Sequence, residues 1–150
     1  MNYKMMGRFI SQILFVEALF MIPALFISLG YGESKAAWAF GITVILILVI
    51  ALALYYVCKG APSAFYAREG LVCVAASWIA LSLVGCLPFY LSREIPKYID
   101  ALFEIVSGFT TTGASIVTDV EALSHGILYW RSFSHWLGGM GVLVFLLALT

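Results

Sequence analysis

Charged side chains are scarce in this chain: Asp, Glu, Lys and Arg make up only 11% of its 150 residues. A soluble domain carries about 25% charged residues, so these few could not cover the surface of one. The eight basic and eight acidic side chains also cancel, which leaves no net positive field to attract nucleic acid. The scarcity of charge therefore excludes a soluble domain and a nucleic-acid-binding protein.

Cysteine is scarce too, and the three present show no C-x-x-C spacing. Cys58, Cys73 and Cys86 lie within apolar runs or at the end of one, where a free thiol packs as a small apolar group. The chain also lacks a nucleophile–base pair and a phosphate-binding loop. We therefore predict that it is not an enzyme and that it binds no cofactor.

Apolar residues are abundant, at 63% of the chain, and the mean hydropathy is +1.05. Four long apolar runs occupy residues 9–29, 38–57, 71–91 and 127–149. Each has the roughly 20 residues that a helix needs to cross a bilayer. A strand of a membrane barrel would be about half as long and would alternate in polarity. The runs predict an all-α integral membrane protein with four transmembrane helices in contact with lipid.

The first run follows Lys4 and Arg8, as the apolar core of a signal peptide would. It is longer than such a core, and Glu17 lies in its middle, so we expect an uncleaved first helix. Glu17 could pair with another helix, but the sequence names no partner. The Lys and Arg residues of the loops slightly favour a cytoplasmic N-terminus.

Residues 99–109, between the third and fourth runs, are apolar but too short to span a membrane. Their apolar positions follow helical spacing on one face: Ile99, Leu102, Phe103, Val106 and Phe109. The residues that follow, 108–115, are too rich in Thr and Gly to continue a stable helix. A short helix that descends and a strand that returns would form a re-entrant hairpin. Because non-helical backbone at membrane depth must be buried in protein or line a watery path, we expect the hairpin to line a pore.

A cation at membrane depth needs oxygen atoms in place of its hydration shell, and backbone carbonyls supply them without fixed charge. Thr110, Thr111 and Thr112 offer carbonyls and hydroxyls, and Gly113 permits a positive φ at the tight point. We therefore predict a selectivity filter over Thr110 to Gly113, with potassium at Thr111, Thr112 and Gly113. The alternative is an ordinary helix C-cap followed by a loop.

Residues 103–115 read F-E-I-V-S-G-F-T-T-T-G-A-S, which resembles the first pore loop of the Trk/Ktr/HKT superfamily of potassium transporters. The resemblance extends through L-Y-W-R at 128–131 to W-L-G-G-M-G at 136–141, and R-E-G at 68–70 and L-P-F at 87–89 also fit. The two additional helices at the N-terminus are similar to the Trk branch.

This resemblance implies a fold of four successive helix–pore loop–helix repeats in one chain around one potassium path. The key glycine of the first repeat then matches Gly113, and a glycine rather than a serine there goes with a preference for potassium over sodium. One repeat is present here, so we expect the N-terminal portion of a longer multi-pass protein of the bacterial inner membrane. Residues 1–60 would form a two-helix hairpin, and residues 61–150 a first repeat truncated at its C-terminus. The implied partners are the three remaining repeats, a cytoplasmic nucleotide-binding regulatory subunit and a second copy in a homodimer.

Several further residues have expected roles around the filter. Glu104 and Ser115 would support it through hydrogen bonds, and Arg131 would either snorkel to the interface or face the pore. Three glycines of the last run would serve close helix packing or a mobile gate: Gly138, Gly139 and Gly141.

The predicted function is potassium uptake across the cytoplasmic membrane, as part of a longer Trk-type transporter. One alternative is the pore subunit of a small homotetrameric potassium channel, although a single glycine stands where such channels have T-V-G-Y-G. Another is a non-conducting membrane assembly factor, in which the hairpin only packs against a partner. The complete reading frame would separate these, because three further loops with a matching glycine would support the Trk type.

Overall fold

The computed structural model describes residues 2–60 and 66–149, with side chains described as far as Gly141. This part of the chain contains helices and no strand. The helices are α1 (Tyr3–Gly30), α2 (Ser34–Val57), α3 (Ala67–Gly85), α4 (Leu87–Leu91), α5 (Tyr98–Phe109), the short 3-10 helix η1 (Val120–Ala122) and α6 (His125–Leu149). The all-α prediction is therefore confirmed for the described residues.

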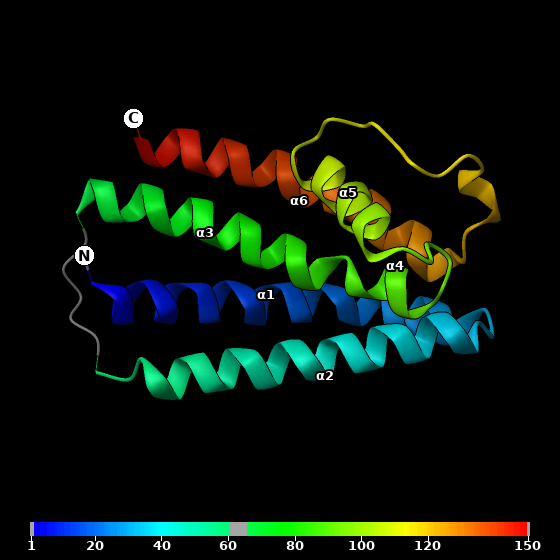
Figure 1. The fold of residues 1–150 in the computed structure, drawn as a ribbon, viewed down its shortest axis with the longest axis horizontal. Coiled ribbons are helices and arrows are strands. Elements are labelled where there is room, and N and C mark those ends of the chain that lie inside the picture. Colours follow the sequence, from blue (N-terminus) through cyan, green and yellow to red (C-terminus); the bar gives the residue numbers. More distant parts are fainter. Residues whose placement is uncertain (1, 61–65, 150) are drawn as a thin grey trace.

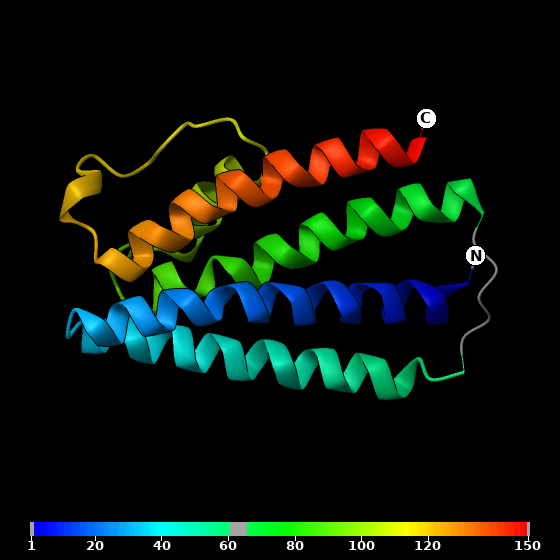
Figure 2. The same cartoon turned by 180° about the vertical axis from the view of Figure 1, so that it is seen from behind.

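The four long helices run side by side along the length of the molecule, and α1 packs against α2, α3 and α6 (Figures 1 and 2). Helix α1 begins and helix α6 ends at the end of the bundle where α3 begins. The turn between α1 and α2, helix α4 and helix η1 lie at the opposite end. There the Glu94 carboxylate accepts hydrogen bonds from the backbone amide of Ser124, at 2.8 Å, and from its hydroxyl. This contact joins the segment before α5 to the segment before α6.

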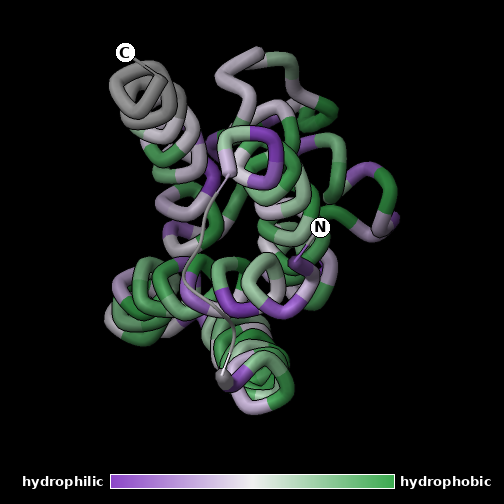
Figure 3. Tube along the Cα trace, turned by 90° about the vertical axis from the view of Figure 1, so that its left-hand side faces the viewer, coloured by the Kyte–Doolittle hydropathy of each residue, from purple (hydrophilic) through white to green (hydrophobic). Residues whose placement is uncertain are grey.

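Within the described residues, three helical segments are long and apolar enough to cross a membrane: α1, α2, and α3 together with α4. Large apolar side chains on these helices are exposed, and Figure 3 shows hydrophobic residues around the helices rather than on one inward face. A lipid environment explains this pattern, because a soluble protein would bury such residues. The fourth predicted span corresponds to α6, which has 25 residues. It stays a prediction because the side chains beyond Gly141 lie outside the described residues.

The third predicted run is divided into two helices at Cys86. Pro88 has no amide hydrogen to donate to Val84, so the helical ladder cannot continue through it. The amides of Phe89 and Tyr90 both donate instead to the carbonyl of Cys86, at 3.1 and 3.3 Å. The carbonyl of Gly85 is thereby left open, and the indole N–H of Trp130 donates to it at 2.9 Å.

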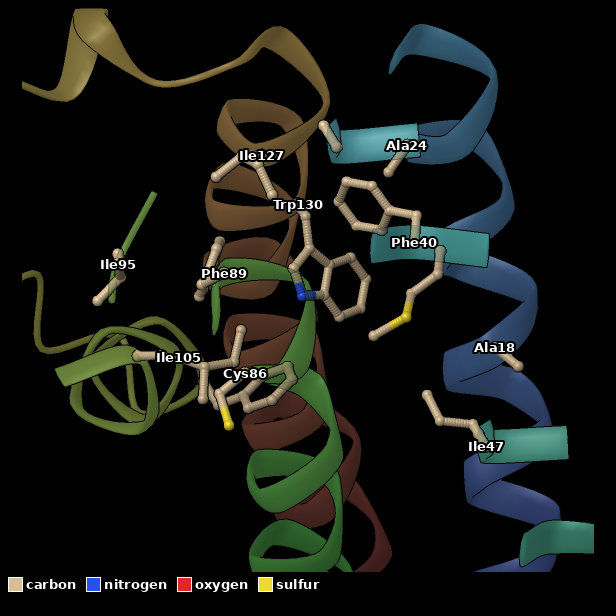
Figure 4. Close-up of a cluster of buried hydrophobic side chains, with 14 of the residues drawn as sticks. Ala18, Ala24, Phe40, Ile47, Cys86, Phe89, Ile95, Ile105, Ile127 and Trp130 are labelled. Atoms are coloured by element: carbon tan, nitrogen blue, oxygen red, sulfur yellow. The ribbon is translucent and has the colours of Figure 1, made fainter. Parts of the chain in front are cut away.

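Trp130 lies at the centre of the apolar core, between Phe40 of α2 and Phe89 of α4 (Figure 4). All three side chains are fully buried, and their van der Waals packing helps to hold the helices together in lipid. The three cysteines are buried and free, as predicted from their apolar surroundings. This core fixes α6 against α1, α2 and α4, and so positions α5 as well.

Candidate functional site

Helix α5 and the segment that follows it form the candidate site. The helix has 12 residues, which at 1.5 Å per residue is about 18 Å and little more than half of a bilayer core of about 30 Å. It starts at the end of the bundle where α4 ends and points toward the middle, and the following segment returns to the same end (Figure 1). The predicted start at Ile99 differs from the observed one by a single residue.

Three of the five apolar positions predicted to share one face of α5 are exposed. Ile99 is 77% exposed, Phe103 47% and Val106 38%. The buried side carries Ile105 and Phe109 together with smaller and polar residues, among them Glu104 and Gly108. At Gly108 a Cβ atom would lie only 2.1 Å from the hydroxyl of Ser134 on α6. The absence of a side chain here lets the two helices approach each other closely.

The segment after α5 is irregular, and the prediction of a returning strand over residues 108–115 is wrong: residues 108 and 109 belong to α5, and the rest form no strand. Its first residues fold back on the last turn of α5, because the amides of Thr111 and Thr112 donate to the carbonyls of Gly108 and Ser107, each at 3.0 Å. Such bonds satisfy carbonyls that a helix end leaves unpaired. They use the amides of Thr111 and Thr112, which a paired strand would need as donors.

Two residues of this segment have a positive φ, Thr111 at 56° and Gly113 at 79°. A β-branched residue in the left-handed region is strained by about 1–3 kcal/mol and persists only where its surroundings fix it. Around Gly113 a Cβ atom would meet nothing within 4 Å. A glycine is needed there for the backbone conformation rather than for space, which agrees with the joint predicted from the sequence.

Three consecutive carbonyl groups are left open by this geometry. Within the described residues, the carbonyl oxygens of Thr111, Thr112 and Gly113 accept no hydrogen bond. The carbonyls on either side are engaged, since Thr110 accepts from the Thr111 hydroxyl and Ala114 accepts from the Ser107 hydroxyl. All residues from Thr110 to Ser115 are exposed. Oxygen atoms are therefore available on an open face of this chain.

Glu104 anchors the far side of the segment. Its carboxylate accepts hydrogen bonds from the hydroxyl of Ser115, at 3.0 and 3.1 Å, and from the amide of Ile116, at 3.1 Å. Arg131 of α6 binds the same carboxylate through Nε, at 2.5 Å. The Glu104 side chain is only 1% exposed and that of Arg131 17%, so charge and hydrogen bonds compensate a buried carboxylate. The structure thus pairs Arg131 with Glu104, a contact that neither of its two predicted roles included.

Ser107 is a second anchor, and the sequence analysis did not identify it. Its hydroxyl donates to the carbonyl of Ala114 at 2.5 Å, while its own carbonyl accepts from the amide of Thr112. One residue on the last turn of α5 therefore holds both sides of the loop that carries Gly113. The available signal was a polar side chain in the last turn of α5, three residues before the threonine run.

The glycines of α6 differ in their surroundings. At Gly138 a Cβ atom would lie 2.1 Å from the carbonyl oxygen of Phe109, the last residue of α5. At Gly141 it would lie 2.7 Å from the ring of Trp78 on α3, whereas at Gly139 the nearest atom, in Thr111, is 4.0 Å away. Gly138 is therefore where the backbone of α6 passes closest to the start of the candidate filter.

Long apolar helices, a half-length helix and a loop with open carbonyls are typical of integral membrane proteins that bind cations through backbone oxygens. A family model described as "TrkH: Cation transport protein" matches residues 37–149. The chain belongs to this TrkH family.

Relatives and a solved structure agree with this assignment. The chain is 34% identical to the Trk system potassium uptake protein TrkG of Escherichia coli (strain K12), covering 91% of this chain and 28% of that protein. It is also 34% identical to the Trk system potassium uptake protein TrkH of Halomonas elongata, covering 99% of this chain and 31% of that protein. The crystal structure of the potassium transporter TrkH from Vibrio parahaemolyticus superposes with a TM-score of 0.90 at 28% identity, covering 99% of this chain and 32% of that one. The chain thus spans about a third of the length of these proteins.

Proposed function

We propose that this chain supplies one part of a potassium-selective filter in a longer Trk-type uptake protein of the bacterial cytoplasmic membrane. The observation that carries the proposal is the run of open carbonyl oxygens at Thr111, Thr112 and Gly113. Such oxygens replace the hydration shell of a potassium ion without bringing fixed charge into the bilayer. The relatives named as potassium uptake proteins support potassium as the ion.

The proposal includes a re-entrant position for α5 and residues 110–119 within the membrane. Support comes from the length of α5 and from the return of the chain to the end of the bundle where α5 starts. Irregular backbone at this depth must line a watery path or be covered by protein. The filter residues are exposed in this chain, as expected if the missing part of an oxygen cage comes from elsewhere.

The remaining parts of the proposal rest on the resemblance. Residues 1–60 form the N-terminal hairpin and residues 61–150 the first repeat, and three further repeats complete the path. A cytoplasmic nucleotide-binding regulatory subunit and a second copy of the protein are the partners. Glu104 and Ser115 hold the filter loop, and Gly138, Gly139 and Gly141 allow α6 to pack or move beside it.

Growth of a potassium-uptake-deficient strain at low potassium tests the function. The complete protein should restore growth, whereas residues 1–150 alone should not, because they provide only part of the cage. Restoration by residues 1–150 alone would favour the homotetrameric channel. Failure of the complete protein, when it is present in the membrane at normal level, would favour the non-conducting assembly factor.

Cysteine labelling tests the re-entrant position. In a variant without its native cysteines, probes at positions 93 and 121 should react with a membrane-impermeant reagent from outside, and a probe at 68 should not. Labelling of 93 and 121 from opposite sides of the membrane would contradict the pore-loop arrangement.

A further inference from the structure

Two basic side chains at the end of the bundle where α5 starts have no acidic partner. Lys35, in the first turn of α2, and Arg93, just after α4, are both exposed, and neither forms an ion pair or a side-chain hydrogen bond within the described residues. The acidic residues close to them in the sequence are engaged elsewhere, since Glu33 binds the start of α6 and Glu94 binds the segment before it. Two positive charges are therefore available to an anion from outside this chain.

These two side chains line one cavity, of about 320 Å³, where α2 meets α4. The wall also includes Trp38 and Ile42 of α2 and Leu91 of α4. The cavity thus combines two positive charges with large apolar side chains. A small soluble anion would use only the charges, whereas an anion attached to an apolar body would use both.

A second cavity, of about 370 Å³, adjoins the first in the groove between α1 and α2. The two cavities share Ser34, Trp38 and Ile42, and the second extends along α2 as far as Ile45. At Gly41, in the wall of the second cavity, a Cβ atom would meet nothing within 4 Å, so the missing side chain leaves the groove open. A groove that begins at two basic side chains and continues between apolar helices matches a charged headgroup followed by an acyl chain.

The exposed side of α2 has the pattern of a lipid-facing surface. Trp38 is 72% exposed near one end of the helix and Tyr56 is 67% exposed near the other, and at 1.5 Å per residue they are about 27 Å apart. This distance is close to the hydrocarbon core of about 30 Å, and Trp and Tyr concentrate at its two boundaries. From Ile42 to Ala53 every exposed side chain is apolar, and α2 lies along one edge of the bundle (Figures 1 and 2). Lys35, one turn before Trp38, then lies at the depth of the headgroups.

Arg93 has a backbone conformation that its side chain does not favour. It is the second residue after the end of α4, and its φ is 60°. Glycine is the usual residue at such a position, because it has no Cβ atom to strain the left-handed conformation. The turn itself therefore does not require an arginine, which indicates a use for the guanidinium group.

We propose that the cavity between α2 and α4 binds an anionic phospholipid. The headgroup phosphate lies between Lys35 and Arg93, and an acyl chain follows the groove that Gly41 leaves open. Guanidinium and ammonium groups are favoured partners of phosphate, and basic pockets between transmembrane helices bind anionic headgroups. The bound lipid joins α2 to the segment before α5, at a place separate from the filter loop.

Fluorescence quenching by brominated lipid tests the proposal in the complete protein, reconstituted into nanodiscs. A bimane label at Leu46→Cys, in a variant without its native cysteines, reports on acyl chains beside α2. Leu46 lies one turn beyond Ile42 on the same exposed side and is in the wall of neither cavity. Nanodiscs of phosphatidylcholine receive increasing fractions of dibrominated phosphatidylglycerol or, in a parallel series, of dibrominated phosphatidylcholine. Since each basic side chain near an anionic headgroup contributes about a fivefold preference, phosphatidylglycerol should bind at least about tenfold more tightly.

Three variants make the result specific to this cavity. Lys35→Gln and Arg93→Gln should each lower the preference for phosphatidylglycerol about fivefold, and the double variant should abolish it. Lys97→Gln is the matched control, because Lys97 is an exposed base at the same end of the bundle and lines neither cavity. It should keep the wild-type preference. Quenching by phosphatidylcholine should be the same in all variants, which shows that the surface of α2 is intact.

Four results would overturn the proposal. Equal affinities of the two lipids in the wild type would mean that the basic residues do not bind the headgroup. An unchanged preference in the double variant would place the anionic lipid elsewhere. Absence of quenching by either lipid would mean that another part of the complete protein covers α2. Loss of the preference on addition of inorganic phosphate, at constant ionic strength, would identify a soluble anion as the occupant.

Discussion

Glu33, in the turn between α1 and α2, binds His125 at the start of α6, although 92 residues separate them. Oε1 of Glu33 accepts a hydrogen bond from the backbone amide of His125 at 2.9 Å and lies 2.8 Å from its Nδ1. The amide of Gly126 donates to Oε2 at 3.4 Å, and the ring of Tyr31 stacks on that of His125 with centroids 3.9 Å apart. A residue of the N-terminal hairpin thus caps the helix that follows the candidate filter.

The Glu33 contact should make stability depend on pH. Burial alone would raise the pKa of Glu33, but the hydrogen bonds from His125 and Gly126 outweigh it and lower the pKa below its usual 4.5. A carboxylate with a lowered pKa stabilises the folded state above pH 4.5, and this contribution is lost as the pH falls through the folded-state pKa. The unfolding temperature of the wild type should therefore fall below pH 4.5 more steeply than that of Glu33→Gln. The matched variant Glu121→Gln should show the same dependence of unfolding temperature on pH as the wild type. An identical dependence for all three proteins would contradict the prediction.

Removal of Arg131 should destabilise the protein through the carboxylate that it leaves behind. In Arg131→Gln the buried Glu104 loses its guanidinium partner, and loss of one partner of a buried pair costs about 3–5 kcal/mol. The double variant Glu104→Gln, Arg131→Gln removes both charges and should recover part of this loss. Free energies of unfolding in detergent, arranged as a double-mutant cycle, measure the coupling. Strictly additive effects would mean that the two side chains do not interact energetically.

Substitution of Gly113 should change ion selectivity. A serine there must adopt the observed φ of 79° at a cost of about 1–3 kcal/mol, or else shift the carbonyls of the filter. Since about 1.4 kcal/mol corresponds to a factor of ten, Gly113→Ser in the complete protein should lower the preference for potassium markedly. Competitive uptake of rubidium and sodium is the measurement. Gly139→Ser is the control, because a Cβ atom there has room. An unchanged ratio of rubidium to sodium uptake in Gly113→Ser, at normal protein level, would place the filter elsewhere.

Adjacent glycines of α6 should respond differently to alanine. In Gly138→Ala the new methyl group would lie 2.1 Å from the carbonyl oxygen of Phe109, so α5 and α6 must move apart. Overpacking of this kind typically costs about 1–3 kcal/mol. Gly139→Ala meets nothing closer than 4.0 Å and should be neutral or slightly stabilising, because alanine favours the helix. Equal free energies of unfolding for the two variants would show that α5 and α6 can move apart at Gly138 without loss of stability.

The helices could be predicted from the sequence because the bilayer imposes a length on each apolar run. Residue patterns also indicated a positive φ at Gly113, which the structure has, and hydrogen bonds from Glu104 and Ser115, which are made to each other; their support of a filter stays a prediction. These features depend only on residues that lie close together in the sequence, within a single segment. The runs did not reveal the break at Cys86, since a proline in an apolar run can bend a helix or interrupt it.

Contacts between distant segments could not be predicted. The pairing of Arg131 with Glu104 depends on how α5 crosses α6, and that crossing is set by the missing side chains of Gly108 and Gly138. The same crossing decides which face of α5 is exposed. Apolar periodicity identifies a face of the helix, but in a membrane protein that face can point to lipid as well as to the core. The Glu33 contact requires the complete arrangement of α1, α2 and α6.

The interruption at Cys86 ties two distant positions of the sequence to one another. Pro88 opens the carbonyl of Gly85, and the indole N–H of Trp130 occupies it. A substitution of Pro88 that restored a continuous helix would return this carbonyl to Phe89 and leave the buried indole without an acceptor. A substitution of Trp130 alone would leave the carbonyl unsatisfied in an apolar environment, where each unsatisfied group costs several kcal/mol. The proline and the tryptophan should therefore be inherited as a pair, and evolution should replace them together or not at all.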